Sequence, residues 1–174
     1  MSRKIIYVFN PISGRKRKNT FLKKIEAATN EKNLPFEFFQ TQPNGDYKLL
    51  RKKIESDKIT EVVIVGGDGT INQVTDSLRG WHVKFGIIPA GSGNGLAYTA
   101  GIPKQLNKAL EIIFNQSSKK TDAFMVGSYY ACMLSGLGFD ATVAQKFAAL
   151  PTRGLITYVK QSLLHFFKAP AYTF

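Results

Sequence analysis

An uninterrupted apolar run, Val62-Val63-Ile64-Val65, is the feature that most constrains what this chain can fold into. A strand with one face in water alternates apolar and polar side chains, whereas a strand buried on both faces is apolar throughout. Strands of the second kind belong to the centre of parallel sheets, where helices cover both faces. The run therefore favours an α/β fold.

The segments on either side of this run alternate between strand and helix. Further strands are predicted at 5–9, 36–39 and 85–88, which are short and apolar or aromatic. Helices are predicted at 15–32, 47–56, 71–78, 94–100 and 104–114. Asp46 is expected to cap the second of these helices. Strands and helices alternating at this spacing indicate a layered α/β domain with a parallel sheet.

The pattern changes near residues 117–120. Beyond them, 123–126 and 128–134 are predicted to be consecutive strands with Gly127 at a hairpin turn, which suggests the antiparallel start of a second unit. The last residues, 171–174, resemble a strand that is cut off. We therefore expect an α/β domain over 1–120 and the opening segment of a truncated, β-rich domain over 121–174.

Charge and cysteine content narrow the possible partners. The chain carries 24 Lys and Arg against 12 Asp and Glu, a formal net charge of +12 in 174 residues. Such a charge favours nucleotide phosphates, nucleic acid or an anionic membrane face. Cys132 is the single cysteine, so no internal disulfide framework is possible, and with only His82 and His165 beside it a zinc site is not expected. No apolar run approaches the roughly 18–20 residues of a transmembrane helix, and we expect a reduced, soluble, intracellular chain.

Glycine-rich loops follow three of the predicted strands. They are Asn10-Pro11-Ile12-Ser13-Gly14, Gly66-Gly67-Asp68-Gly69-Thr70 and Pro89-Ala90-Gly91-Ser92-Gly93-Asn94-Gly95. In a parallel sheet all three fall at the carboxyl ends of the strands, where open α/β proteins bind ligands. Glycines let the backbone approach a phosphate, and amide N–H groups at helix starts supply donors. Any one loop could be an ordinary turn, but the three together favour a phosphate site, where Asp68 can hold Mg²⁺.

Two common nucleotide-binding motifs do not apply. The Walker pattern Gly-x-x-x-x-Gly-Lys-Ser/Thr is absent. Residues 136–141, Gly-Leu-Gly-Phe-Asp-Ala, fit the dinucleotide pattern, but the acidic residue expected about twenty positions later is missing, because no acid follows Asp140. We interpret this segment as a turn that enters a helix.

The loops at 10–14, 66–70 and 89–94 together resemble those of the diacylglycerol kinase catalytic family, which includes sphingosine kinases and bacterial lipid kinases. The resemblance continues through Ile71 and Asn72 and, in the second unit, through residues 136–141. It implies an NAD kinase/phosphofructokinase-like nucleotide-binding lobe followed by a β-rich lipid-binding lobe, with the site between them. The implied activity is transfer of the ATP γ-phosphate, with Mg²⁺, to the hydroxyl of a diacylglycerol or sphingoid-like lipid.

The resemblance also implies which residues contact ATP. They are Asn10, Pro11, Ile12, Ser13, Gly14, Thr41, Gly66, Gly67, Asp68, Gly69, Thr70, Ile71, Asn72 and Ser92, with Asp68 as the candidate Mg²⁺ ligand. The residue after Asn72 is usually Glu in this family, so Gln73 removes a carboxylate near the site. The family's general base is expected beyond Phe174, so no catalytic residue is assigned and the chain is expected to be inactive alone.

Other interpretations stay open. An NAD kinase-like enzyme shares the Gly-Gly-Asp-Gly-Thr loop, and a nucleotide-binding module without catalytic activity is a second alternative. The charge also suits a nucleic-acid binder, but no recognition helix or stacking platform is evident, and nucleic acid is not expected as a partner. The basic, aromatic tail after Asp140 belongs either to an unfinished core or to a helix at an anionic membrane surface. We expect ATP and a lipid alcohol as partners and a cytoplasmic location, with peripheral attachment at the inner membrane face left open.

Overall fold

The structure is a computed structural model that describes residues 2–11, 18–42, 45–136, 138–148 and 155–166. The chain divides into two compact units, residues 1–133 and 134–174. Described elements of the first unit are a sheet, five helices and a hairpin, and those of the second are two helices. The glycine-rich loops that the sequence singles out all belong to the first unit.

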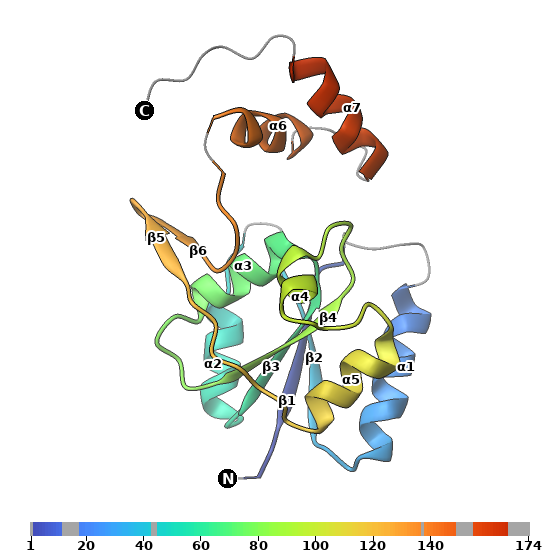
Figure 1. The fold of residues 1–174 in the computed structure, drawn as a ribbon. Coiled ribbons are helices and arrows are strands. Elements are labelled where there is room, and N and C mark those ends of the chain that lie inside the picture. The colour runs from blue at the N-terminus through green and yellow to red at the C-terminus, as the bar shows by residue number, and fades with distance from the viewer. Residues whose placement is uncertain (1, 12–17, 43–44, 137, 149–154, 167–174) are drawn as a thin grey trace. The chain divides into compact units, whose positions relative to one another are not determined.

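Four parallel strands form the sheet of the first unit: β1 (Ile5–Phe9), β2 (Phe36–Gln40), β3 (Glu61–Gly66) and β4 (Lys84–Pro89). Their order is β2-β1-β3-β4 (Figure 1). The first residues of the four strands stand side by side in register, so the strands end at a common edge. β3 is buried along its whole length, as the apolar run predicts. The expected α/β fold with a parallel sheet is confirmed.

Helices cover both faces of this sheet. They are α1 (Lys18–Glu31), α2 (Lys48–Ser56), α3 (Asp68–Ser77), α4 (Gly95–Thr99) and α5 (Leu106–Phe114). Successive strand residues point to opposite faces, so β1 contributes to two separate cores. Ile6 and Val8 belong to the core beneath α2 and α3. Ile5 and Tyr7 belong to the core on the other face, beneath α1 and α5 (Figure 1).

The start of α3 differs from the prediction. The helix begins at Asp68, three residues before the expected Ile71. Two glycines made the segment look like a loop, because glycine is a poor helix former. An acidic residue in the first turn favours the helix through its dipole, and Gly67 precedes it in extended conformation. Within the Gly-Gly-Asp-Gly-Thr motif, Gly66 ends β3, Gly67 is the N-cap, and Asp68 to Thr70 form the first turn of α3.

Asp46 contributes to the start of α2, although it does not occupy the cap position. Tyr47 is the N-cap residue, and its side chain makes no capping hydrogen bond. The Oδ1 atom of Asp46, one residue earlier, accepts a hydrogen bond from the Lys48 N–H at 2.9 Å. One of the amides that a helix start leaves unpaired is thereby satisfied.

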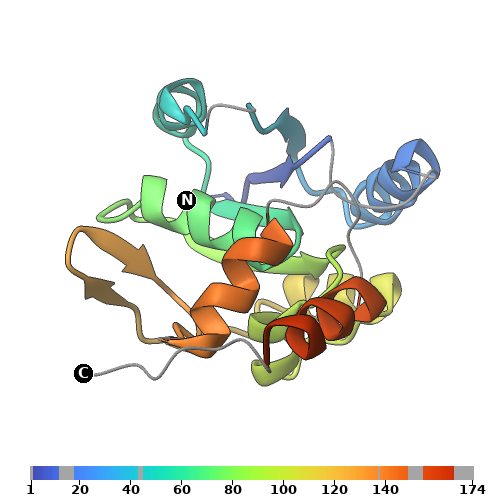
Figure 2. The same cartoon turned by 90° about the horizontal axis from the view of Figure 1, so that it is seen from above.

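A short antiparallel hairpin follows the α/β layers. It consists of β5 (Phe124–Val126) and β6 (Tyr129–Ala131), joined by a turn in which Gly127 has a φ of 60°. The hairpin lies beside α3 in both views (Figures 1 and 2) and belongs to the first compact unit. The predicted hairpin and its turn are confirmed, but β6 ends at Ala131, three residues before the predicted end of the second strand. The domain boundary after residue 120 stays a prediction.

The second unit contains α6 (Phe139–Ala148) and α7 (Leu155–Phe166), which pack on each other. The rings of Phe139 and Phe166 meet edge to face, with centroids 5.9 Å apart. Gly138 has a φ of 73° immediately before α6, which agrees with a turn that enters a helix. Within the described ranges no helix has the length and apolarity needed to cross a membrane. The strand expected at 171–174 lies outside the described residues.

Candidate functional site

The strand order reverses the direction of winding at β1. From β1 the chain passes through α1 to β2 on one side, and it then returns to β3 on the other side of β1. In open α/β sheets, ligands bind where the direction of winding reverses in this way, beyond the carboxyl ends of the strands. Asn10 follows β1 at this point, and Gly66 ends β3 beside it.

Two of the glycine-rich loops touch backbone to backbone. A Cβ atom at Gly91 would lie 2.4 Å from the Cα atom of Gly67, and one at Gly67 would lie 2.9 Å from the Cα atom of Gly91. The Ala90 N–H also donates to the Gly66 carbonyl at 2.9 Å. No side chain fits between the loops, so glycine is required at both positions.

Asn94 holds the third loop in shape. It has a left-handed conformation, with a φ of 61°, and it is 6% exposed. Its Oδ1 accepts from the Gly91 N–H at 2.8 Å, and its Nδ2 donates to the Gly91 carbonyl at 2.8 Å. Both ends of the side-chain amide are thus used to close a four-residue loop. Asparagine tolerates the left-handed region better than most residues, which suits it to this position.

Asp68 ties the second loop to the third. Its Oδ2 accepts from the Gly95 N–H at 3.0 Å, and its Oδ1 accepts from the Leu96 N–H at 3.1 Å. The carboxylate therefore caps α4 from the first turn of α3. Within the described part of the chain, no group of three or more His, Cys, Asp and Glu side chains is placed to hold a metal ion. Asp68 is accordingly a single carboxylate among amides.

Glycines in the second loop serve different purposes. A Cβ atom at Gly66 would lie 2.9 Å from the Cβ atom of Thr70, whose side chain is buried. Gly69, by contrast, has ordinary helical conformation and open space around its missing Cβ. Packing within the chain therefore explains glycine at 66 but not at 69. The room beside Gly69 is available to a ligand that approaches the backbone.

The first loop and β2 complete the edge. Thr41 is 5% exposed and its N–H donates to the Phe9 carbonyl at 2.9 Å, which brings it next to Asn10. Ser92 is exposed in the third loop. Ile12, Ser13 and Gly14 lie outside the described residues. The structure thus gathers the predicted positions of β1, β2, β3 and β4 at one edge, as far as these positions are described.

Two predicted ATP contacts use their side chains elsewhere. Ile71 is 1% exposed and belongs to the core beneath α2 and α3. The side chain of Asn72 bonds to the main chain of Tyr130 in β6 and of Cys132, the residue after the strand. Neither observation tests whether these residues contact ATP, and both assignments stay predictions.

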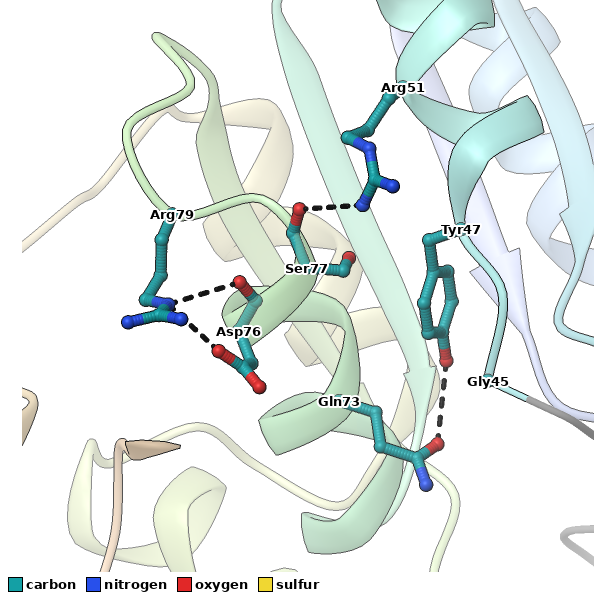
Figure 3. A pocket seen from close by; sticks show the side chains of 7 residues that line it. All are labelled: Gly45, Tyr47, Arg51, Gln73, Asp76, Ser77 and Arg79. Atoms are coloured by element: carbon teal, nitrogen blue, oxygen red, sulfur yellow. Dashed lines mark hydrogen bonds and ion pairs between the residues drawn. The ribbon is translucent and has the colours of Figure 1, made fainter. Parts of the chain in front are cut away.

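Gln73 faces a different part of the surface. It lines an open hollow of about 370 Å³ between α2 and α3, together with Gly45, Tyr47, Arg51, Asp76, Ser77 and Arg79 (Figure 3). Its Oε1 accepts from the Tyr47 hydroxyl at 3.4 Å, and burial raises the pKa of that hydroxyl. Both arginines are engaged, Arg51 with the Ser77 carbonyl and Arg79 with Asp76. None of the three glycine-rich loops contributes to this hollow.

Sequence reasoning missed the side-chain hydrogen bonds of two residues at this edge, Asp68 and Asn94. The Asp68 carboxylate was assigned to Mg²⁺ and not to the start of α4, because an acid 27 positions before a helix gives no capping pattern. Asn94 stands at the start of the helix predicted at 94–100, whereas in the structure it precedes α4 in left-handed conformation. Its left-handed conformation has a local signal, since Asn beside glycine is typical of such turns.

A parallel sheet with a reversal of winding, and glycine-rich loops pressed together at its carboxyl edge, define an α/β protein with a ligand site at that edge. Within that class, the chain belongs to the diacylglycerol kinase catalytic domain family, whose sequence profile matches residues 4–126. This membership agrees with the resemblance carried by the loops. It favours the lipid-kinase interpretation over the NAD kinase-like alternative.

Individual relatives support the same membership. A diacylglycerol kinase of Bacillus subtilis (strain 168) is 30% identical over 138 residues, which cover 75% of this chain and 44% of that protein. The sphingoid long-chain bases kinase 1 of Arabidopsis thaliana is 27% identical, over 98% of this chain and 24% of that protein. A crystal structure of a diacylglycerol kinase from Bacillus anthracis str. Sterne matches with a TM-score of 0.61 at 25% identity, over 74% of this chain and 45% of that one. The chain thus spans less than half the length of each of these proteins.

Proposed function

We propose that this chain is the ATP-binding part of a lipid kinase, which transfers the γ-phosphate of ATP to the hydroxyl of a diacylglycerol or sphingoid-like lipid. The observation that carries the proposal is the contact between the Gly67 and Gly91 backbones. This contact brings two glycine-rich loops together at the edge where the sheet reverses its winding. Membership of a kinase family gives ATP as the phosphate donor.

Phosphate recognition would rest mainly on the backbone. The first amides of α3, from Asp68 to Thr70, have no partner inside the helix, because the first turn of a helix leaves its N–H groups unpaired. These amides and the helix dipole favour an anion at this end. Gly69 leaves open space beside them. A hydrogen bond to a charged group contributes about 1.5–3 kcal/mol, so a few such amides suffice for binding in the micromolar range.

The residues at the edge are compatible with Mg²⁺. This ion keeps several waters and is usually held by one or two carboxylates together with substrate phosphates. Asp68 supplies one carboxylate, and each of its oxygens accepts a single amide, which leaves lone pairs for a metal or its waters. Bound Mg²⁺ would neutralise charge on the phosphates. The proposed role of Asp68 is to hold this ion while it fixes the start of α4.

The transfer itself needs groups that we do not assign to this chain. The lipid hydroxyl oxygen forms a bond to the γ-phosphorus, the bond from that phosphorus to the bridging oxygen of ADP breaks, and the hydroxyl proton passes to a general base. Asp68 is proposed to hold Mg²⁺, so it is not assigned as this base. The relatives are more than twice as long as the matched region. We therefore propose that the base comes from outside this chain and that the chain alone is inactive.

Charge supports a location for the acceptor. The chain has a net charge of +12, which favours an anionic surface such as the inner face of a membrane. We propose that the protein is cytoplasmic and meets its lipid alcohol at such a surface. Binding of the chain to vesicles with and without anionic lipid tests this location. Equal or absent binding to both would favour a soluble acceptor.

Calorimetric titration of Mg-ATP into the wild type and Gly69→Ala tests the nucleotide site. Because Gly69 has helical conformation and free space, alanine should stabilise the fold by about 0.5–1 kcal/mol. We nevertheless expect the affinity for Mg-ATP to fall at least about tenfold, which is about 1.4 kcal/mol. Asn107→Ala, on the exposed side of α5, is the control and should bind as the wild type does. Absence of binding by the wild type, or equal binding by Gly69→Ala, would contradict the proposal.

Labelled ATP incubated with a lipid panel and with NAD tests the reaction. No label should appear on any acceptor with this chain alone. Label in the lipid fraction would overturn the proposed inactivity, and label on NAD would overturn the choice of acceptor.

A further inference from the structure

The β5–β6 hairpin packs against one side of α3. Asn72 and Thr75 lie three residues apart on one side of α3, and Arg79 lies in the turn that follows the end of the helix at Ser77. The Thr75 hydroxyl contacts the Cys132 Sγ atom at 3.5 Å. The Arg79 guanidinium lies 5.6 Å from the centre of the Tyr130 ring. The hairpin is thus attached to α3 at Asn72 and Thr75 and to the turn after the helix at Arg79.

Asn72 makes the most specific of these contacts. Its Nδ2 donates to the Tyr130 carbonyl at 3.0 Å, and its Oδ1 accepts from the Cys132 N–H at 3.1 Å. Main-chain groups of alternate residues point to the same edge of a strand, while those between them point to the other edge. The Asn72 amide therefore pairs with β6 as a neighbouring strand would, on the edge opposite β5.

Only an amide can make both bonds. The Tyr130 carbonyl needs a donor and the Cys132 N–H needs an acceptor, and asparagine presents one of each. Aspartate at this position would keep the acceptor and place a second oxygen against the carbonyl. Alanine would leave both main-chain groups without their partner, at the edge of a strand three residues long.

The same residue lies close to the candidate nucleotide loop along the chain. Thr70, two residues earlier, packs against Gly66, and the Ile71 N–H donates to the Gly67 carbonyl at 3.1 Å. In the other direction, β6 ends two residues before the first unit does. Asn72 thus connects the Gly66–Thr70 loop to the last element of the first unit.

We propose that Asn72 is a positioning residue that fixes the β5–β6 hairpin relative to the Gly66–Thr70 loop, so that occupation of the loop is transmitted to the hairpin. The inference rests on the proposed function, because it takes Mg-ATP as the occupant. Asn72 would act through Tyr130 and Cys132, and its side chain would not contact the nucleotide.

Amide hydrogen exchange across residues 123–133, with and without Mg-ATP, tests this role in the wild type, Asn72→Ala and Asn72→Asp. In the wild type, Mg-ATP should slow exchange in β6. In Asn72→Ala, exchange of the Cys132 amide should be about tenfold faster, as expected for the loss of one hydrogen bond. At a Mg-ATP concentration that saturates each variant, the nucleotide should no longer slow exchange in the hairpin of Asn72→Ala. Asn72→Asp should retain protection of the Cys132 amide, and Asn107→Ala should behave as the wild type.

The outcomes separate the two proposals. Weaker Mg-ATP binding in Asn72→Ala with unchanged hairpin exchange would make Asn72 an ATP contact and overturn the positioning role. Faster exchange with the response to Mg-ATP retained would reduce Asn72 to a structural residue, which also overturns it. Absence of Mg-ATP binding by the folded wild type would remove the proposed function and the coupling with it. If circular dichroism shows that Asn72→Ala is unfolded, Asn72→Asp takes its place. Loss of the slowing of hairpin exchange by Mg-ATP in Asn72→Asp would support the positioning role, and full retention would overturn it.

Discussion

The two edges of the central sheet are built in opposite ways. At the amino edge, charged side chains from distant segments pair with one another. Arg3 binds both carboxylate oxygens of Glu61 and donates to the carbonyls of Ile113 and Phe114 at the end of α5. At the carboxyl edge, the one carboxylate of the second loop, Asp68, accepts backbone amides instead.

The two edges differ in whether their polar groups are paired within the chain. At the amino edge, the strand starts and helix ends carry side chains whose partners lie within the chain, including Lys4, Glu37, Lys53 and Asp57. At the carboxyl edge, glycines bring bare backbone together, and helix α3 begins there. We infer that the first edge serves stability and the second serves a ligand. Substitutions at the two edges should therefore have different signatures.

Breaking the amino edge should have the largest effect on stability. Arg3→Ala leaves Glu61, which is 7% exposed, without its cation and removes two carbonyl partners. Loss of one partner from a buried pair costs about 3–5 kcal/mol, and we expect a loss of about 3 kcal/mol in urea unfolding. Arg3→Lys keeps the charge without the two-pronged geometry and should lose less. A loss below about 1 kcal/mol, the range of exposed pairs, would contradict the comparison.

Separating the two loops at the carboxyl edge should lower the stability somewhat less, but it should abolish Mg-ATP binding. The Cβ atom in Gly91→Ala would lie 2.4 Å from the Gly67 Cα atom, so one loop must move. Overpacking of this kind costs about 1–3 kcal/mol, and Mg-ATP binding should be lost. The matched comparison is Gly69→Ala, which should remain stable. Retained Mg-ATP affinity in a folded Gly91→Ala variant would show that the contact between the loops is not needed.

At Asn94, the contributions of backbone conformation and of side-chain hydrogen bonds to stability can be measured separately. Asn94→Gly keeps the left-handed conformation and loses the two bonds to Gly91, at an expected cost of about 1 kcal/mol. Asn94→Ala adds the strain of a left-handed alanine, about 1 kcal/mol more. Urea unfolding of both variants measures the two contributions. Equal stability of the two would mean that the φ of 61° is not maintained after substitution.

The smallest effect should be a dependence on pH at the amino edge. Hydrogen bonds from the Ser56 hydroxyl and the Lys53 ammonium lower the pKa of Asp57 below its ordinary value of 3.8. A carboxyl whose pKa is lower in the folded state stabilises the fold above the ordinary value, and this contribution is lost as the pH falls through the folded-state pKa. Urea unfolding at several pH values should show the wild type slightly more stable than Asp57→Asn near neutrality and equal to it in strong acid. A difference that persists in acid would point to another cause.

Most of the α/β layers could be predicted from the sequence because their patterns are local. The apolar residues of β1 and β3 predict strands buried on both faces, and every strand of the sheet was found to within one residue at either end. Helix α3 was placed three residues late, because the signal of two glycines outweighed that of Asp68. Residues 155–166 form helix α7, whereas their aromatic and basic composition predicts no single role, since it suits either a core or an interface.

The candidate site was predictable in outline but not in its internal contacts. Glycine-rich loops after parallel strands must meet at one edge, and this follows from the sequence pattern alone. Which loop touches which depends on the strand order, and the contact of Gly67 with Gly91 follows from β3 lying beside β4. The bond from Asn72 to Cys132 joins residues 60 positions apart and has no local signal at all. Such contacts are set by tertiary packing.

The strand order also bears on how the chain is made. β1 is synthesised first and its residues Ile5 to Val8 are fully buried in the finished protein, but its partner β3 ends only at Gly66. At a synthesis rate of about 5–20 residues per second, β1 waits about 3–11 s for that partner. During this interval its apolar side chains are available to chaperones and to other nascent chains. A pause in translation before β3 is synthesised should therefore increase aggregation more than a pause after β4 is synthesised.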